Sequence, residues 1–397
     1  MIPAIWRART MLTNEGSRTG MRRFLTAGLL ASTLTIVGLG CPIASAATVI
    51  PGYAPVLSPI LRVAAGTIHV FQAKDQSSEG SSHGILTVQR YTGGTWRSTT
   101  VATLPGMNIS ALASVCNPTQ CLAAVETDPV WSRTEPFYLS VYRHQMKARG
   151  RKRVWRLRLP SGVGAGRITM AQSGQLVWLL ADGTPSASLM PKVLYFSRDR
   201  GTHWTVFANQ GAGNPSRITL PDGYPTGMTA LRGGRLIMTV DTGTSALPAA
   251  VEYRANPPGQ GSIPLPSRTN DGLIDPFPAV TNGTTVAIPA KIVSATTGAT
   301  RFGLFTKDAS RWVFHRVRIT LGQSELSENG TAVFWNAHAL QVVSLGHSVI
   351  SLPIPSAYGR AIAVAVIASD RIAVLTNRHA VWIKTFHGIW TQLDSMK

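Results

Sequence analysis

Short hydrophobic runs alternate with turn-forming residues along nearly the whole chain. The runs are rich in β-branched and aromatic residues, and clusters of Gly, Pro, Asn and Asp separate them. This alternation predicts β-strands joined by turns, and helical periodicity is nearly absent. We therefore predict an all-β protein.

The predicted strands recur in a fixed order. A pair of apolar strands is followed by a loop and then by a hairpin that has an aromatic residue just after its turn. The inner pairs start near Ile60, Ile109, Ile168, Met228, Phe277, Asn329 and Ala361. A four-stranded unit that repeats about every fifty residues indicates a β-propeller.

We predict seven blades, with six blades as the second choice and a pair of β-sandwiches as the rival architecture. The sixth hairpin is reduced to "HSVISLPIPS" from His347, so we expect the sixth or the last blade to be incomplete. Each blade buries its faces against its neighbours, and the last blade must therefore meet the first. The segment "TVIPGYAPVL" (48–57) is available as an added strand that locks the ring.

The N-terminal region has the pattern of a secretory signal peptide. Arg22 and Arg23 precede an uncharged apolar run, and Ala44-Ser45-Ala46 is a small-residue cleavage site. We predict cleavage of residues 1–46, of which the first twenty are an upstream extension, and one propeller domain over 47–397. A secreted or extracytoplasmic bacterial protein follows from this reading.

Three other readings of this region stay open. The apolar run could be a retained membrane anchor, the paired arginines allow twin-arginine export, and Cys41 allows a lipoprotein. The rest of the chain has no apolar run long enough to predict a transmembrane helix.

Composition favours a folded, strongly basic protein. The 397 residues are 44% hydrophobic and 14% charged, with a formal charge of +20. Removal of residues 1–46 takes five of the 38 basic and one of the 18 acidic residues, which leaves 33 and 17 and a net charge of +16. Such a charge favours anionic partners: a phospholipid surface, an acidic polymer or nucleic acid.

Two cysteines remain after cleavage. Cys116 and Cys121 end two predicted strands, and "NPTQ" between them has the composition of a turn. Because an exported protein with paired cysteines favours a disulfide, we predict one here. A metal site is the rival, but no histidine lies nearby in the sequence.

One predicted hairpin carries a dense basic tip. Its candidate residues for binding a polyanion are Lys147, Arg149, Arg151, Lys152 and Arg153. The tip has no aromatic platform, so we do not expect sequence-specific recognition of nucleic acid. The alternative is a hairpin whose charge serves only solubility.

A second candidate site lies in the loop "ETDPVWSRTEPF". The candidate residues for binding a saccharide are Glu126, Asp128, Trp131, Arg133 and Glu135. Carboxylates around a tryptophan suit a sugar ring. The alternative is a solvated loop whose tryptophan packs on the next blade.

The stretch "FSRDRGTHW" concentrates polar residues at a predicted hairpin turn. Asp199 can accept hydrogen bonds from turn N–H groups, Gly201 tolerates a positive φ, and Trp204 can cover the turn. Together with Ser197, these residues resemble the Asp-box, or BNR repeat, of sialidase-like and photosystem II assembly factor-like β-propellers. The resemblance implies a structural motif on the face opposite the active site.

Sialidase chemistry is not evident in the sequence. The resemblance implies an arginine triad, a tyrosine nucleophile paired with a glutamate, and an aspartate acid/base. The first inner strand has Arg62 but lacks the Arg-Ile-Pro signature. We therefore assign no catalytic residue and lean against an enzyme, and we expect no cofactor and no metal site, since the histidines have no metal-ligand spacing.

The function expected from these features is binding. We predict a noncatalytic, monomeric propeller that binds an anionic cell-surface or extracellular polymer, or a protein partner. A degenerate sialidase-like glycoside hydrolase and a scaffold without a small-molecule ligand are the alternatives.

Overall fold

The fold is given by a computed structural model. It describes residues 57–78, 81–129, 137–145, 151–183, 190–211, 218–242, 249–265, 272–283, 285–294, 296–308, 311–319, 323–326, 330–346, 348–368 and 370–393. These residues form strands β1–β29 and one 3₁₀ turn, η1 (Ser356–Tyr358). None of the helical structure in these ranges could cross a bilayer. The predicted signal peptide lies outside the described residues.

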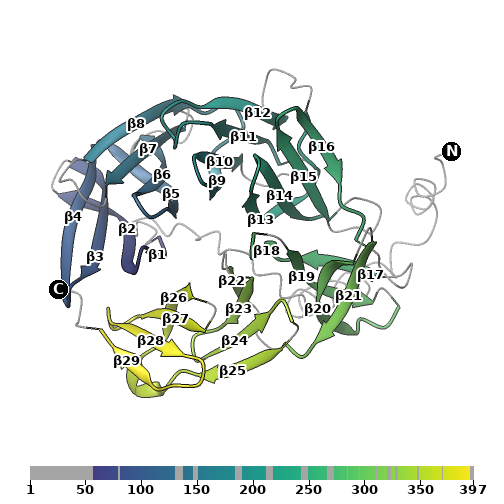
Figure 1. The fold of residues 1–397 in the computed structure, drawn as a ribbon. Coiled ribbons are helices and arrows are strands. Elements are labelled where there is room, and N and C mark those ends of the chain that lie inside the picture. Colours follow the sequence, from purple (N-terminus) through teal and green to yellow (C-terminus); the bar gives the residue numbers. More distant parts are fainter. Residues whose placement is uncertain are drawn as a thin grey trace, which may run out of the picture. The chain divides into compact units, whose positions relative to one another are not determined.

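The strands form seven antiparallel sheets, each built from strands that are consecutive in sequence (Figure 1). The first four sheets comprise β1 (Ile60–Ala64), β2 (Thr67–Ser78), β3 (Ser81–Thr92) and β4 (Thr95–Pro105); β5 (Met107–Cys116), β6 (Gln120–Pro129), β7 (Tyr138–Gln145) and β8 (Arg151–Arg158); β9 (Ala165–Ser173), β10 (Leu176–Gly183), β11 (Lys192–Ser197) and β12 (Thr205–Gln210); and β13 (Tyr224–Leu231), β14 (Arg235–Asp241), β15 (Ala250–Ala255) and β16 (Pro258–Ser262). The last three comprise β17 (Gly272–Pro276), β18 (Val280–Thr281), β19 (Val286–Ser294), β20 (Thr300–Asp308) and β21 (Arg311–Val317); β22 (Gln323–Leu326), β23 (Thr331–Trp335), β24 (Ala339–Ser344) and β25 (Val349–Pro353); and β26 (Ala361–Ala368), β27 (Arg371–Thr376), β28 (Val381–Thr385) and β29 (Trp390–Gln392).

The seven sheets are the blades of a β-propeller, which confirms the predicted fold. The core is a series of apolar clusters, one between each pair of neighbouring blades in the described part of the chain. Strands in the middle of a blade are therefore buried on both faces, as in β10, where Val177 to Gly183 are all buried. This explains why these strands read as nearly continuous apolar runs.

The ring closes through apolar packing between the last blade and the first. Leu61, Ile68 and Val70 of blade 1 pack against Leu375 and Val381 of blade 7. Each of these two blades has four strands of its own, all from one end of the described chain. The predicted added strand at 48–57 lies outside the described residues except for Leu57.

The prediction of an incomplete sixth or last blade was wrong, because both blades have four strands. The missed strand is β22, whose sequence is Gln-Ser-Glu-Leu and has a single apolar residue. The sequence pattern therefore indicates its neighbours β23 and β24 as the inner pair. In the fifth blade the predicted start at Phe277 falls between β17 and β18, two pieces that both pair with β19.

The propeller has two faces that differ in the connections they carry. We call "turn face" the side with the turns between first and second strands and between third and fourth strands, such as residues 117–119 and 198–204. We call "mouth face" the side with the loops between second and third strands and with the links between blades, such as 336–338 and 354–360. Antiparallel pairing within every blade fixes this division.

Leu61→Ala should weaken ring closure. Leu61 is 1% exposed and lies in the cluster between blades 7 and 1. The lost contacts and the cavity should lower the free energy of unfolding by about 2–5 kcal/mol, measured by urea denaturation. Ile389→Ala, at a residue of blade 7 that is 81% exposed, should change it by less than about 0.5 kcal/mol. Equal losses in the two variants would contradict closure by this packing.

Candidate functional site

Arginine and lysine gather on the turn face. The described cations beside its turns are Arg90, Arg97, Arg143, Arg153, Arg198, Arg200, Arg232, Arg235, Arg254, Lys307, Arg311, Arg371 and Lys384. The acidic side chains described beside the same turns are those of Asp199, Glu252 and Asp370. The turn face is therefore strongly basic. Blades 2 to 4 supply seven of these arginines, and we call six of them the cationic belt: Arg143, Arg153, Arg198, Arg200, Arg235 and Arg254.

The belt crosses from blade 2 to blade 3 through direct hydrogen bonds. The Nη2 atom of Arg143 donates to the carbonyl of Arg200 at 3.1 Å and to Oγ1 of Thr202 at 2.6 Å. The amide of Gln120 donates to the same carbonyl at 3.2 Å. These bonds hold the turn that carries Arg200 against the second blade, and Arg200 itself is exposed.

The belt continues from blade 3 to blade 4. Arg198 donates from Nη2 to the carbonyl of Ala255 at 3.3 Å. In blade 4, Arg235 donates to both oxygens of Glu252, at 2.8 and 3.2 Å, and Nε of Arg254 lies 3.9 Å from Oε1 of the same carboxylate. One carboxylate thus serves two arginines, which leaves this part of the belt positive.

The carboxylate of Asp199 fastens the turn in the middle of the belt. Its Oδ1 accepts hydrogen bonds from the hydroxyl of Ser197 at 2.8 Å and from the backbone N–H groups of Thr202 and His203 at 3.0 and 2.8 Å. Burial opposes ionisation, but the hydrogen bonds from His203, Ser197 and Thr202 outweigh it and lower the pKa of Asp199 to about 2. The ionised carboxylate of Asp199 is therefore hydrogen-bonded within its own turn.

The same turn contains an unusual backbone conformation. Arg200 and Gly201 both have positive φ, 58° and 81°. Glycine adopts this region without cost, whereas arginine does not. The indole of Trp204 donates to the carbonyl of Gly201 at 3.0 Å and covers the turn.

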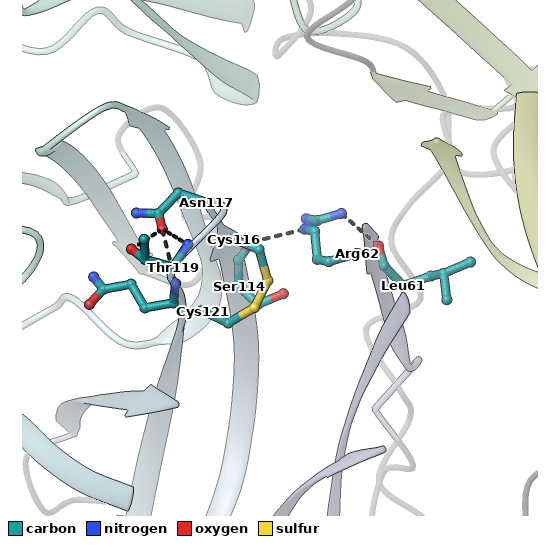
Figure 2. The surroundings of a disulfide bond; sticks show 8 residues. Leu61, Arg62, Ser114, Cys116, Asn117, Thr119 and Cys121 are labelled. Carbon is teal, nitrogen blue, oxygen red and sulfur yellow. Dashed lines mark hydrogen bonds between the residues drawn. A yellow bond between two sulfur atoms is a disulfide. The ribbon is translucent and has the colours of Figure 1, made fainter. Parts of the chain in front are cut away.

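The hairpin beside this turn carries the predicted disulfide, which is present between Cys116 and Cys121 with a Cα–Cα distance of 4.1 Å. Figure 2 shows its surroundings: the carboxamide oxygen of Asn117 accepts hydrogen bonds from the backbone N–H and the hydroxyl of Thr119. On the other side, Arg62 of β1 reaches toward β5 (Figure 2). The disulfide and the turn bonds brace the edge of blade 2 that Gln120 ties to the belt.

The structure brings together only part of the predicted polyanion site. Lys147 and Arg149 lie outside the described residues. Arg151 and Lys152 lie at the start of β8, opposite His144 and Arg143, and Arg153 is exposed on the same strand. The belt therefore begins where the predicted basic tip joins its blade.

The predicted saccharide site is described only at its base. Trp131, Arg133 and Glu135 lie outside the described residues. Glu126 is fully buried and accepts a hydrogen bond from Ser110 at 2.8 Å. Burial raises the pKa of Asp128, against a hydrogen bond from its neighbour Asn108. A glycosidase needs two carboxylates at the sugar bond, and Glu126 is sealed from solvent.

A cavity of about 620 Å³ lies where blades 6, 7 and 1 meet. It is lined by Ser58, Pro59, Ile60, Leu61, Arg62, Trp335, Asn336, Ala337, Ala361, Ile362, Ala363 and Val364. Its volume is in the range of small-molecule sites, and its lining is mostly apolar. Of these residues, only Arg62 stands out as a candidate in the sequence, because the lining residues meet through the closure of the ring.

A buried carboxylate and a buried ammonium lie opposite each other in blade 3. Asp182 and Lys192 are cross-strand neighbours with 3% and 0% exposure. Lys192 donates from Nζ to the carbonyls of Pro221 and Gly223, both at 2.7 Å, and so holds the link to blade 4. Burial raises the pKa of Asp182 to about 6 and lowers the pKa of Lys192 to about 8.

Comparison with known proteins places the chain by fold. No family model matches the sequence, and no curated protein matches it. The propeller domain of the Trilobed protease from Pyrococcus furiosus, which has an open velcro topology, is similar with a TM-score of 0.51 and 9% identity over 85% of this chain and 99% of that one. An acylaminoacyl peptidase is similar with a TM-score of 0.50 and 9% identity, over 85% of this chain and 52% of that one. An α-L-arabinanase from Penicillium chrysogenum has a TM-score of 0.44 and 17% identity, over 70% of this chain and 94% of that one. The likenesses to the Trilobed protease domain and to the acylaminoacyl peptidase are likenesses of fold alone.

Asp199→Ala should destabilise the turn that presents Arg200. Loss of the carboxylate leaves N–H groups and the Ser197 hydroxyl without their acceptor, which should cost about 1–2 kcal/mol of unfolding free energy, measured by urea denaturation. Asp370→Ala removes an exposed acid from another turn on the same face and should cost less than about 0.5 kcal/mol. Equal effects would show that the hydrogen bonds of Asp199 add nothing.

Asp182→Asn should flatten the pH dependence of stability. The folded protein keeps the Asp182 proton up to about pH 6, while the ordinary pKa is 3.8, so the wild type should lose unfolding free energy as pH rises between these values. The loss is roughly 1–3 kcal/mol for a pKa shift of this size. Urea unfolding at pH 4 and pH 7 measures it. Asp370→Asn should keep the wild-type slope, and the same slope in Asp182→Asn would refute the assignment.

Proposed function

We propose that the protein is a secreted, noncatalytic β-propeller that binds an anionic cell-surface or extracellular polymer through the cationic belt. The observation that carries this proposal is the linkage of arginines from three consecutive blades by hydrogen bonds across the turn face. A polymer with repeated negative charges fits a site that is long and positive along its whole length.

The fixed geometry of the belt supports binding. Arg143 and Arg198 are held by carbonyls of the next blade, so their guanidinium groups are oriented before a ligand arrives. Because these side chains are already ordered, they lose less conformational entropy when a ligand binds. Guanidinium groups also form paired hydrogen bonds with carboxylate, sulfate and phosphate oxygens.

The charge balance of the belt supports the same conclusion. Two carboxylates lie among its described residues, Asp199 and Glu252. Asp199 is bonded within its own turn, and Glu252 is shared by Arg235 and Arg254. Arg153, Arg198 and Arg200 are exposed, and no ion pair is described for them. They are the residues through which we expect first contact with the polymer.

The conformation of Arg200 also favours a role in binding. At φ 58° a glycine or asparagine would be more stable. Arginine at this position places a long, exposed cation on the turn. The predicted signal peptide would bring this surface to the outside of the cell, where acidic polymers occur.

Replacing three belt arginines should weaken binding to polygalacturonate. Arg153→Gln, Arg200→Gly and Arg254→Gln in one chain should lower affinity at least tenfold at low salt and reduce the slope of log affinity against log salt concentration, because fewer counterions are released. Titration calorimetry at several salt concentrations measures both. The Arg200→Gly change relieves a strained backbone, so the midpoint of thermal unfolding should not fall on its account.

A matched variant on the mouth face tests whether position matters. Arg316, Arg318 and Arg360 are exposed there, and their replacement by glutamine removes the same charge. This variant should bind within about threefold of the wild type. Equal losses in the two variants would show that net charge, rather than the belt, governs binding. No binding by the wild type would overturn the proposal.

A further inference from the structure

A fully buried histidine occupies an apolar position between blades 1 and 2. His69 lies on the face of β2 that also presents Phe71 and Ala73 to the cluster between these blades. It is 0% exposed, and neither ring nitrogen has a hydrogen-bond partner among the described residues. A buried polar group without a partner destabilises the fold, so this position calls for a ligand that the side chains around it do not supply.

The side chains that face His69 are cationic or can become so. Arg62 of β1 and Arg90 of β3 are its direct cross-strand neighbours, and such neighbours lie on the same face of a sheet. The ring of His144 from blade 2 lies edge-to-face at a centroid distance of 6.3 Å. The charged groups that act on His69 are thus His144 and Arg90, both of them bases. This environment excludes a metal cation as the natural occupant.

A second buried donor faces the same interface. Ser114 of β5 is 1% exposed, and in the part of the chain that the structure describes its hydroxyl has no hydrogen-bond partner. Its strand neighbours Leu112 and Cys116, two residues away on each side, pack in the cluster between blades 1 and 2. The carbonyl of Ser114 accepts a hydrogen bond from Nε of Arg62 at 3.0 Å, which Figure 2 shows reaching from β1 to β5. Ser114 therefore lies beside the Arg62–His69–Arg90 row.

We propose that the interface between blades 1 and 2 is a buried binding site for a small inorganic anion such as chloride. The imidazole N–H of His69 and the hydroxyl of Ser114 donate to the anion, and the guanidinium groups of Arg62 and Arg90 stabilise its charge. The fully buried Phe71 and Cys121 beside the site limit the ligand to a small ion. This site is inside the propeller and independent of the cationic belt.

Anion binding and protonation of His69 should be coupled. Burial, and then the charges of His144 and Arg90, lower the pKa of His69 to about 4. A bound anion opposes these effects and favours the imidazolium, which donates from both nitrogens. Affinity for the anion should therefore rise as the pH falls toward the pKa.

The test compares thermal unfolding in sodium chloride and in sodium gluconate at equal ionic strength, at pH 5 and pH 8. Gluconate is too large to enter the site. The wild type should unfold at a midpoint about 2–4 °C higher in chloride at pH 5, with a smaller difference at pH 8, because a ligand that binds only the folded state stabilises it. His69→Leu should abolish the difference, and Ser114→Ala should reduce it.

Two controls separate this site from surface effects. His338→Leu removes an exposed imidazole on the mouth face and should keep the wild-type difference. The triple belt variant should keep it too, which distinguishes this site from anion binding by the belt. Equal midpoints of the wild type in the two salts, or a difference that persists in both His69→Leu and Ser114→Ala, would overturn the proposal. Ser114→Ala also decides the matter if His69→Leu does not fold.

Discussion

Apolar packing between neighbouring blades is the interaction on which the rest of the structure depends. Every blade is a sheet of consecutive strands, so no described strand is shared between the first blade and the last. Closure depends on Leu61 and Val70 meeting Leu375 and Val381. A ring of this kind is held by many similar interfaces, and loss of one exposes two apolar faces. Its geometry therefore tolerates few polar residues between blades.

The apolar packing between blades limits where charged side chains can lie. Strands with both faces buried leave the turn face and the mouth face as the places for ionisable side chains, and the chain has more bases than acids to place. Arginines from different blades become neighbours because the turns of all blades emerge on one side. The few polar residues that lie between blades, such as His69 and Lys192, are conspicuous because their desolvation must be offset by a specific partner.

The repeat in the sequence was sufficient to predict the propeller and its seven blades, since strand periodicity and turn residues are local properties. It failed at β22, whose residues Gln323–Leu326 pair through the backbone and include one apolar side chain, which is too few to leave an apolar pattern. The belt was predicted only at Arg153. Arg143 and Arg200 are 57 residues apart, and their contact depends on how blade 2 packs against blade 3. The importance of His69 could not be read from the sequence, because its contact with His144 depends on how blade 1 packs against blade 2.

The turn at Asp199 combines hydrogen bonds that stabilise its backbone with an exposed cation, the side chain of Arg200. Its carboxylate satisfies the backbone of the turn, and the bonds from Gln120 and Arg143 fix the turn to the next blade. This support is strong enough to hold Arg200 in a left-handed conformation that arginine alone would avoid. The polar residues of the turn therefore position Arg200 without using its side chain in the hydrogen bonds of the turn.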